Sequence, residues 1–286
     1  MENFTVVFDT NSYRDLFDRT GSPQKPTVSQ IRSNEQSRNI VSLANWYVLQ
    51  ELASHLQDPT EPRSYRQCAS AVSAMFHHCR SGTEDKVRWC ADSESQMATY
   101  LYGICKDNRA AYEMCQTLLE VVASSWPNEL PPFVADFAKR SADFLDAAEK
   151  AFIDDMQRGK FKRDPQKVAR HYVAGVRASI GKSPLDYNDP EMAQDATDVL
   201  NAFGPQIELF AKLCGNLATG AGDMTKQKKP NLMWDMKILA GIGHEIETIG
   251  RLHLVTGDKE MRKASTAVGL VQYIHSLDEY LALIGL

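Results

Sequence analysis

Short strand-like runs of apolar residues lie near the two ends of this 286-residue chain, and almost none lie between them. Residues 4–8 form an apolar run too short for a helix, and residues 39–44 form a second one. Near the other end, residues 252–256 and 266–273 have the same character. This distribution predicts a single parallel sheet to which both ends of the chain contribute strands.

The middle of the chain has a different pattern, with long amphipathic stretches separated by Gly and Pro breaks. It predicts helices at residues 63–80, 93–105, 109–125, 132–157, 165–180 and 189–217. Outside this region, helices are predicted at 12–17, 45–56, 231–249, 259–263 and 277–284. We therefore expect an α/β fold whose parallel sheet is flanked by helices. Residues 1–57 plus 228–286 would form one discontinuous domain, and residues 58–227 a large all-α insertion.

Composition narrows the classes of function. The chain is 43% hydrophobic and 24% charged, as in a globular protein, and its net charge of −5 excludes a generic polyanion binder. It contains no run long enough for a membrane helix and no signal-peptide pattern at its start. The six cysteines form no C-x-x-C pair and are interpreted as reduced thiols. We expect a cytoplasmic protein with no membrane partner.

Acidic residues stand just beyond two of the predicted strands. Asp9 follows residues 4–8, and Asp258 follows residues 252–256 after one glycine. In α/β sheets, ligands bind beyond the carboxyl ends of the strands. Glu51 adds a third carboxylate, at the margin of the apolar face of the predicted helix 45–56. Carboxylate oxygens are the ligands that hard divalent cations prefer.

Asp235 is a fourth candidate because of its place on the predicted helix 231–249. At helical spacing it shares a face with several isoleucine and leucine residues, including Ile238 and Ile242. The apolar members of that face must pack inward, so the carboxylate points toward the sheet. A buried carboxylate is costly unless it is paired or binds a cation.

Each acidic residue also has an ordinary interpretation. Asp9 and Asp235 could cap the helices that they begin, and Asp258 could belong to a simple turn. Glu51 could be a solvated helix residue. The occurrence of all four on the predicted elements favours a shared metal site over four unrelated roles.

Four short motifs carry these acidic residues. They are Val7-Phe8-Asp9-Thr10-Asn11, Val48-Leu49-Gln50-Glu51-Leu52, Asn231-Leu232-Met233-Trp234-Asp235 and Leu254-Val255-Thr256-Gly257-Asp258. In this order, and on these elements, they resemble the motifs of PIN-domain nucleases. The resemblance covers about residues 1–56 and 230–286. The long interval between Glu51 and Asp235 departs from the compact form of that family.

The resemblance implies a PIN-like fold and a metal-dependent nuclease activity. Asp9, Glu51, Asp235 and Asp258 would be the catalytic residues and would hold one or two Mg²⁺ or Mn²⁺ ions. Thr10, Asn11 and Thr256 would orient these ligands or the scissile phosphate. Such enzymes usually cut RNA, often structured RNA such as tRNA. Many are toxins or defence effectors, for which a protein inhibitor or regulatory partner is expected.

Basic residues in two segments are candidates for nucleic-acid contacts. Arg163, Lys167 and Arg170 belong to a stretch, residues 158–182, that contains one acidic residue, Asp164. Lys228 and Lys229 precede Asp235. A phosphate backbone would bind such groups. The alternatives are a solvated helix face for the first segment and a connecting loop for the second.

Two other functions stay open from sequence alone. The same scaffold could cut DNA, because composition does not separate the two substrates. A non-catalytic interaction protein could act through the helical insertion, with the acidic site vestigial. Assembly into a homo-oligomer is also left open.

Overall fold

A computed structural model describes residues 3–57, 62–81, 86–125, 130–157, 164–218, 237–245 and 250–286. The fold is α/β, with a four-stranded, all-parallel sheet in the order β2-β1-β3-β4. The strands are β1 (Phe4–Phe8), β2 (Val41–Ser42), β3 (Arg251–Val255) and β4 (Ile274–His275). Strands from both ends of the chain meet in this sheet, which confirms the coarse prediction.

Strand β1 lies at the centre of the sheet because all five of its residues are apolar or readily buried. Every one of them is buried in the structure. It pairs with β3 along its whole length, from Phe4 opposite Arg251 to Phe8 opposite Val255. On its other side it pairs with the two-residue strand β2. The register of β1 against β3 therefore brings the residues after Phe8 beside those after Val255.

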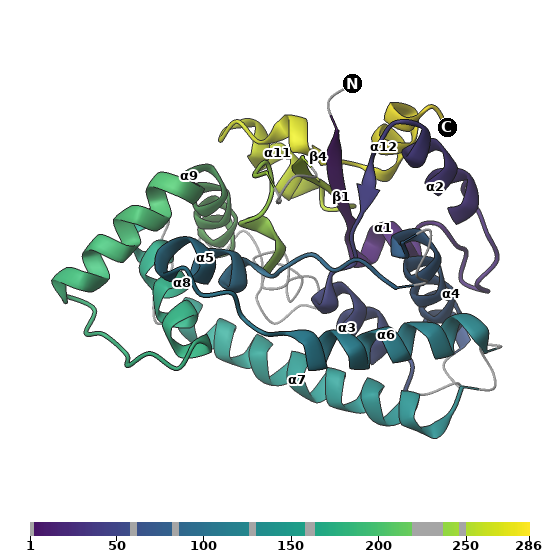
Figure 1. The fold of residues 1–286 in the computed structure, drawn as a ribbon, viewed down its shortest axis with the longest axis horizontal. Coiled ribbons are helices and arrows are strands. Elements are labelled where there is room, and N and C mark those ends of the chain that lie inside the picture. The colour runs from purple at the N-terminus through teal and green to yellow at the C-terminus, as the bar shows by residue number, and fades with distance from the viewer. Residues whose placement is uncertain are drawn as a thin grey trace.

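Within the described ranges, five helices accompany the strands: α1 (Thr10–Arg14), α2 (Val28–Ser37), α3 (Trp46–Ser54), α11 (Lys259–Thr266) and α12 (Leu277–Ile284). Each begins after a side chain that caps it. Thr27 and Ser276 form capping boxes with Gln30 and Glu279. Asn45, Asp9 and Asp258 also accept hydrogen bonds from backbone N–H groups of the first turn. Figure 1 shows α2, α11 and α12 near the sheet.

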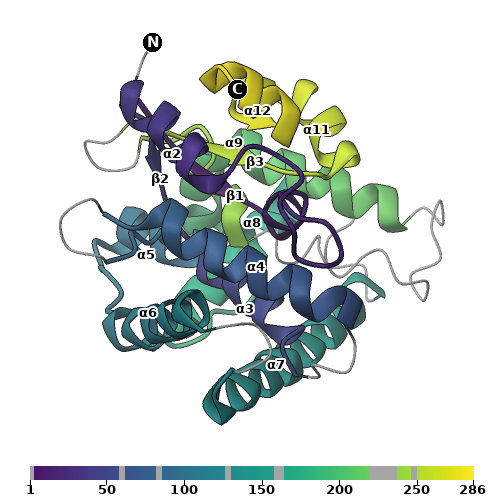
Figure 2. The same ribbon diagram turned by 90° about the vertical axis from the view of Figure 1, so that its right-hand side faces the viewer.

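The helices that follow α3 in the middle of the chain lie at the predicted positions. They are α4 (Pro62–Cys79), α5 (Ser93–Tyr102), α6 (Arg109–Ser124), α7 (Pro132–Gln157), α8 (Pro165–Ser179) and α9 (Pro190–Ala218). Helix α8 packs along α9, α4 along α6, and α7 along α3. Figures 1 and 2 show α6 and α7 below the sheet and its nearby helices. Helix α9 is kinked at Phe203, two residues before Pro205.

The strand predicted at residues 266–273 is wrong. Helix α11 continues to Thr266, and a 3₁₀ helix occupies Val271–Tyr273. Only Ile274 and His275 pair with β3. Leu270, an apolar residue of this stretch, lies in a turn instead. Its side chain is buried, and its N–H donates to the carbonyl of Ser265.

The helix predicted at residues 231–249 is also wrong at residues 240–245, while residues 231–236 and 246–249 lie outside the described residues. Residues 237–239 are helical, and the chain then turns. Gly243, at φ 79°, donates its N–H to the carbonyl of Leu252, and Leu252 donates to the carbonyl of His244. The segment therefore pairs with β3. Ile242 is buried as predicted, but from this turn and not from a helix.

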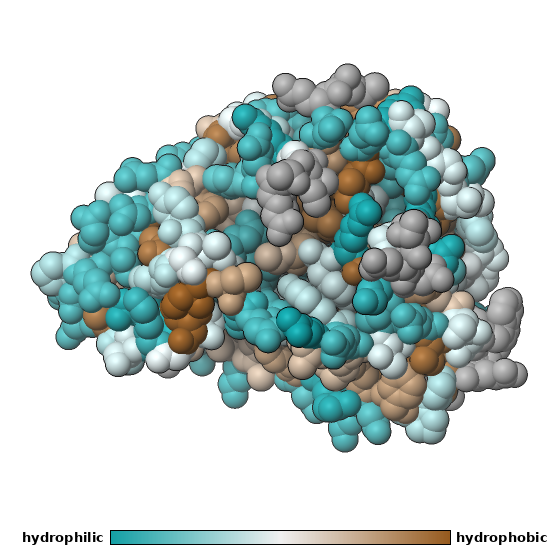
Figure 3. Space-filling model, in the orientation of Figure 1, coloured by the Kyte–Doolittle hydropathy of each residue, from teal (hydrophilic) through white to brown (hydrophobic). Residues whose placement is uncertain are grey.

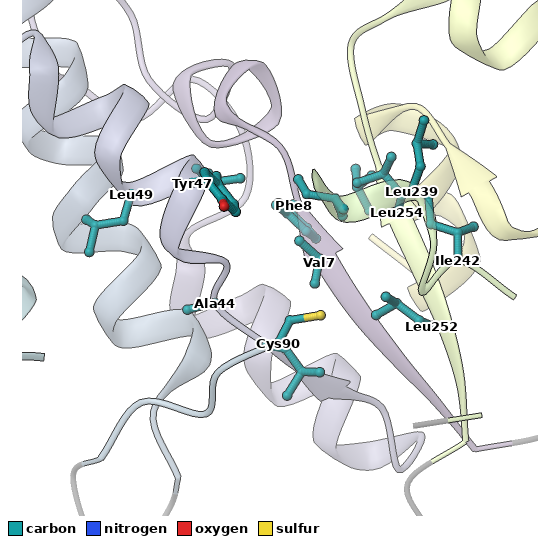
Figure 4. Close-up of a cluster of buried hydrophobic side chains, with 14 of the residues drawn as sticks. Val7, Phe8, Ala44, Tyr47, Leu49, Cys90, Leu239, Ile242, Leu252 and Leu254 are labelled. Carbon is teal, nitrogen blue, oxygen red and sulfur yellow. The ribbon is translucent and has the colours of Figure 1, made fainter. Parts of the chain in front are cut away.

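One hydrophobic core extends from the sheet into the helical region. Figure 4 shows Val7 and Phe8 of β1 between Leu252 and Leu254 on one side and Tyr47 of α3 on the other. Buried residues of α6, α8 and α9 belong to the same cluster: Leu118, Val168 and Phe210. The sheet and the long helices thus stabilise one another by burying a shared apolar surface.

Gly250 is required at the start of β3. Its φ is 101°, and a Cβ atom there would lie 2.1 Å from the carbonyl oxygen of Asn3. We expect Gly250→Ala to lower the free energy of unfolding by at least about 1–3 kcal/mol, through backbone strain and this clash. Urea unfolding would measure it. Gly204→Ala is the control, because a Cβ atom added at Gly204 would meet only open space. Equal stability of both variants would contradict the prediction.

The face drawn in Figure 3 is mostly hydrophilic, with hydrophobic residues in separate patches. Within the described ranges, no helix combines the length and apolar character needed to cross a bilayer.

Candidate functional site

Asp9 is buried at the carboxyl end of β1, where it caps α1. Its Oδ1 accepts a hydrogen bond from the backbone N–H of Ser12 at 2.6 Å. Its Oδ2 accepts from the hydroxyl of Thr256 at 2.6 Å and from the N–H of Gly257 at 3.3 Å. The β1–β3 register explains these contacts, because Thr256 follows Val255, the partner of Phe8. Three groups from two elements therefore fix one carboxylate.

Glu51 of α3 reaches the same region through Thr10. The buried hydroxyl of Thr10 donates to Oε2 of Glu51 at 2.6 Å. Thr10 is the residue after Asp9, and the charge of Asp9 acts on the Glu51 carboxyl. The predicted association of Asp9 with Glu51 thus has a physical basis in the folded chain.

The Asp9 and Glu51 carboxyls are both buried, and burial disfavours their ionised form. Burial raises the pKa of Asp9, against the hydrogen bonds from Ser12, Thr256 and Gly257. Burial, assisted by the charge of Asp9, raises the pKa of Glu51 to about 7, although the hydrogen bond from Thr10 opposes the shift. Carboxylates with raised pKa values at a strand end are typical of functional sites.

Asp258 is connected to Asp9 but has a capping role. Its backbone N–H donates to Oγ1 of Thr256, whose hydroxyl donates to Asp9. Its Oδ1 accepts from the N–H groups of Glu260 and Met261 at 2.8 and 3.0 Å, at the start of α11. One carboxylate oxygen is thus committed to the helix.

Of the other predicted site residues, one lies near Asp9 in the structure and several lie outside the described residues. Asn11 lies against the turn at Gly257, so that a Cβ atom added to this glycine would be 3.3 Å from the Cβ of Asn11. Asp235, Arg163, Lys228 and Lys229 lie outside the described residues. Among the residues that the structure does describe, no three His, Cys, Asp or Glu side chains are grouped so that they could hold a metal ion. The described part of the site is therefore a pair, Asp9 and Glu51.

The basic stretch in α8 is largely engaged within the helical region. Arg170 donates to the carbonyl of Tyr187, and its guanidinium lies 4.5 Å from that ring's centroid. Arg177 is buried and paired with Glu191 at 2.6 Å. Lys167 is half-buried on the same helix. Local packing thus accounts for Arg170 and Arg177, and phosphate binding by Lys167 and Arg170 stays a prediction.

A buried polar network around His78 of α4 was missed by sequence reasoning. Glu35 of α2 contacts Nε2 of His78 with both oxygens, at 2.9 and 3.0 Å. Ser42 and Tyr280 also donate to Glu35, and Tyr13 contacts Nδ1 of His78 at 3.0 Å. Burial alone would lower the pKa of His78, but the Glu35 carboxylate raises it to about 10.

The network joins α1, α2, α4, α12 and β2, whose residues are far apart in the sequence. The imidazolium of His78 in turn lowers the pKa of Glu35, against the effect of burial. One local feature of the sequence could have indicated this network. Glu35 lies four residues after Ile31 and shares its buried face of α2. Because Tyr13 belongs to α1, the helix that Asp9 caps, the network supports the candidate site.

We expect the Glu51 carboxyl of the metal-free protein to titrate near pH 7, observed by carbon NMR of labelled glutamate. Thr10→Val should raise this pKa further, because it removes the hydrogen bond that favours the carboxylate. Thr117→Val, at an exposed threonine that bonds only within α6, is the control. A Glu51 midpoint near the ordinary value of 4.5 would contradict the burial described above.

Comparison with protein-family models, curated proteins and solved structures found no match to this chain.

Proposed function

We propose that this chain is a metal-dependent endoribonuclease with a PIN-like site built on Asp9 and Glu51. The observation that carries the proposal is that Asp9, just beyond a central parallel strand, and Glu51, bound by the next residue Thr10, both have a raised pKa, with the Asp9 charge acting on Glu51. A divalent cation would offset the cost of their burial. Asp258 and Asp235 are the further ligands that the motif order suggests.

The donor set fits Mg²⁺ or Mn²⁺. Asp9 and Glu51 offer oxygen atoms only, and each carboxylate oxygen can accept more than one interaction. Bound here, the cation would lower the pKa of water and offset charge on the phosphate. The reaction then requires no Ser, Cys or His nucleophile.

The neighbouring residues position the carboxylates. Thr256 and Gly257 hold Oδ2 of Asp9, and Ser12 holds Oδ1. Thr10 holds Glu51. Because all these groups sit on strand ends or helix starts, the two acids are held in place before a substrate binds, which reduces the cost of ordering them during the reaction.

A cavity of about 560 Å³ adjoins this site at Gly257. It is lined by basic and acidic side chains, among them Lys25, Lys259, Arg262 and Asp15. Lys25 forms an ion pair with Asp278, which also lines the cavity, and Arg262 forms one with Glu279. We propose that a nucleotide next to the scissile phosphate lies here, with its phosphate near Lys259.

The test is cleavage of matched single-stranded RNA and DNA, and of tRNA, by the purified protein. We expect cuts in RNA with Mg²⁺ or Mn²⁺, and none with EDTA. Cuts confined to DNA would reassign the substrate and keep the site. An inert protein with every substrate and metal would overturn the nuclease proposal and favour an interaction protein that acts through its long helices.

A further inference from the structure

A second cavity lies away from Asp9 and Glu51, between α2, α4 and α6. Its volume is about 560 Å³, within the range of small-molecule sites. Figure 2 shows α4 between α2 and α6, and all three helices contribute lining residues. Leu16 and Phe17, from the loop after α1, also line it. None of the predicted acidic residues of the nuclease site that the structure describes lines it, and it shares one lining residue, Phe17, with the cavity at Gly257.

The lining has two chemically different parts. One part is apolar and includes Leu16, Phe17, Val28, Ala74 and Val122. The other part is basic and consists of Arg32 of α2, His77 of α4 and Arg80 just after α4. No acidic residue is among the described residues that line the cavity. Such a cavity suits a ligand with an apolar body and a negatively charged end.

The basic groups are held together against their mutual repulsion. Arg32 donates from Nη1 to the carbonyl oxygen of His77 at 3.3 Å, which anchors the guanidinium beside α4. The backbone also brings Arg88 close to Arg80. The N–H of Arg88 donates to the carbonyl of Cys79, and Arg80 forms an antiparallel backbone bridge with Val87. Burial, then the charges of Arg80 and Arg88, lower the pKa of Arg32.

The carboxylate that acts on Arg32 within the described ranges is Glu35, and its oxygens are already engaged by His78, Ser42 and Tyr280. Burial, with the charges of Arg80 and Arg32, also lowers the pKa of His77. A ligand with more than one negative charge relieves this repulsion better than a carboxylate, and guanidinium groups bind phosphate oxygens in a forked geometry.

We propose that the cavity between α2, α4 and α6 binds a small organic phosphate of nucleoside-monophosphate size. The phosphate contacts Arg32, Arg80 and His77, and the apolar or aromatic body lies against Leu16, Phe17 and Val122. The site is separate from the proposed nuclease centre, and its occupancy does not require a metal ion.

The experiment is calorimetric titration with each of the four nucleoside 5′-monophosphates, in EDTA. We expect saturable binding of at least one of them, with adenosine or uridine and inorganic phosphate each binding at least about tenfold more weakly. Arg32→Gln and Arg80→Gln should each weaken nucleotide binding by about tenfold or more. Arg109→Gln, an exposed arginine on α6 outside the cavity, should leave it unchanged.

Further variants distinguish binding in this cavity from binding at the proposed nuclease site and from loss of the fold. Ser73→Phe would fill the cavity and should abolish binding, while Asp9→Asn should bind like the unchanged protein. Proton NMR should show the His77 pKa rising when the nucleotide binds, because an anion stabilises the imidazolium. Absence of saturable binding to the folded protein at about 1 mM nucleotide would overturn the proposal, and so would binding that survives both arginine substitutions.

Discussion

Asp9→Asn is expected to reduce metal-dependent RNA cleavage by at least about 10²-fold. The substitution keeps an oxygen that can accept the N–H of Ser12, so the cap of α1 is retained. It removes the negative charge that a divalent cation would bind. The initial rate of RNA cleavage, at saturating Mn²⁺, is the quantity to measure.

Asp92→Asn is the matched control for this experiment. Asp92 is also a buried aspartate that caps a helix, and it accepts the N–H of Ser95 at 2.7 Å at the start of α5. Both variants lose a buried carboxylate charge at a helix cap. If the two variants retained the same activity, Asp9 would be a structural cap only.

Glu35→Ala is expected to lower the free energy of unfolding by about 3–5 kcal/mol, because it leaves the buried imidazolium of His78 without its partner. Ser42 and Tyr280 would also lose their acceptor. Asp278→Ala is the control, since it breaks an exposed ion pair with Lys25 and should cost about 1 kcal/mol or less. Urea unfolding of both variants makes the comparison. Equal losses would contradict a buried, charged pair.

The pair also predicts how stability depends on pH. The folded pKa of His78 is about 10, above its ordinary value of 6.5, so its contribution is complete below about pH 6.5. That contribution declines as the pH rises from 6.5 toward 10. The folded pKa of Glu35 is below 4.5, so its contribution is lost as the pH falls below that value. The decline on the alkaline side should shrink in Glu35→Gln.

Local sequence signals were sufficient for most elements of the fold. The five buried residues of β1 form a short run of four apolar residues and Thr5, and α7 has the limits predicted by its periodicity and by the breaks at Pro131-Pro132 and Gly159. The helix predicted at residues 231–249 fails at residues 240–245, because periodicity could not reveal that Gly243 pairs with Leu252. That pairing depends on a strand which lies next to the turn only in the folded chain.

The candidate site was predictable where it depends on strand ends. Asp9 and Thr256 are close because β1 and β3 are parallel neighbours, which the strand-end rule anticipates. The hydrogen bond from Thr10 to Glu51 joins residues 41 positions apart, and no local motif encodes it. The contact between Glu35 and His78 is similar, because each residue has an ordinary helical neighbourhood and acquires its charge partner only through packing.

Mn²⁺ binding to the unchanged protein and to the double variant Asp9→Asn/Glu51→Gln tests the central claim most directly. Electron paramagnetic resonance would count the bound ions in the absence of nucleic acid. We expect at least one bound ion in the unchanged protein and its loss in the double variant, with the folded state of both verified by circular dichroism. Equal Mn²⁺ binding by the two folded proteins, or none by either, would contradict a metal centre at Asp9 and Glu51.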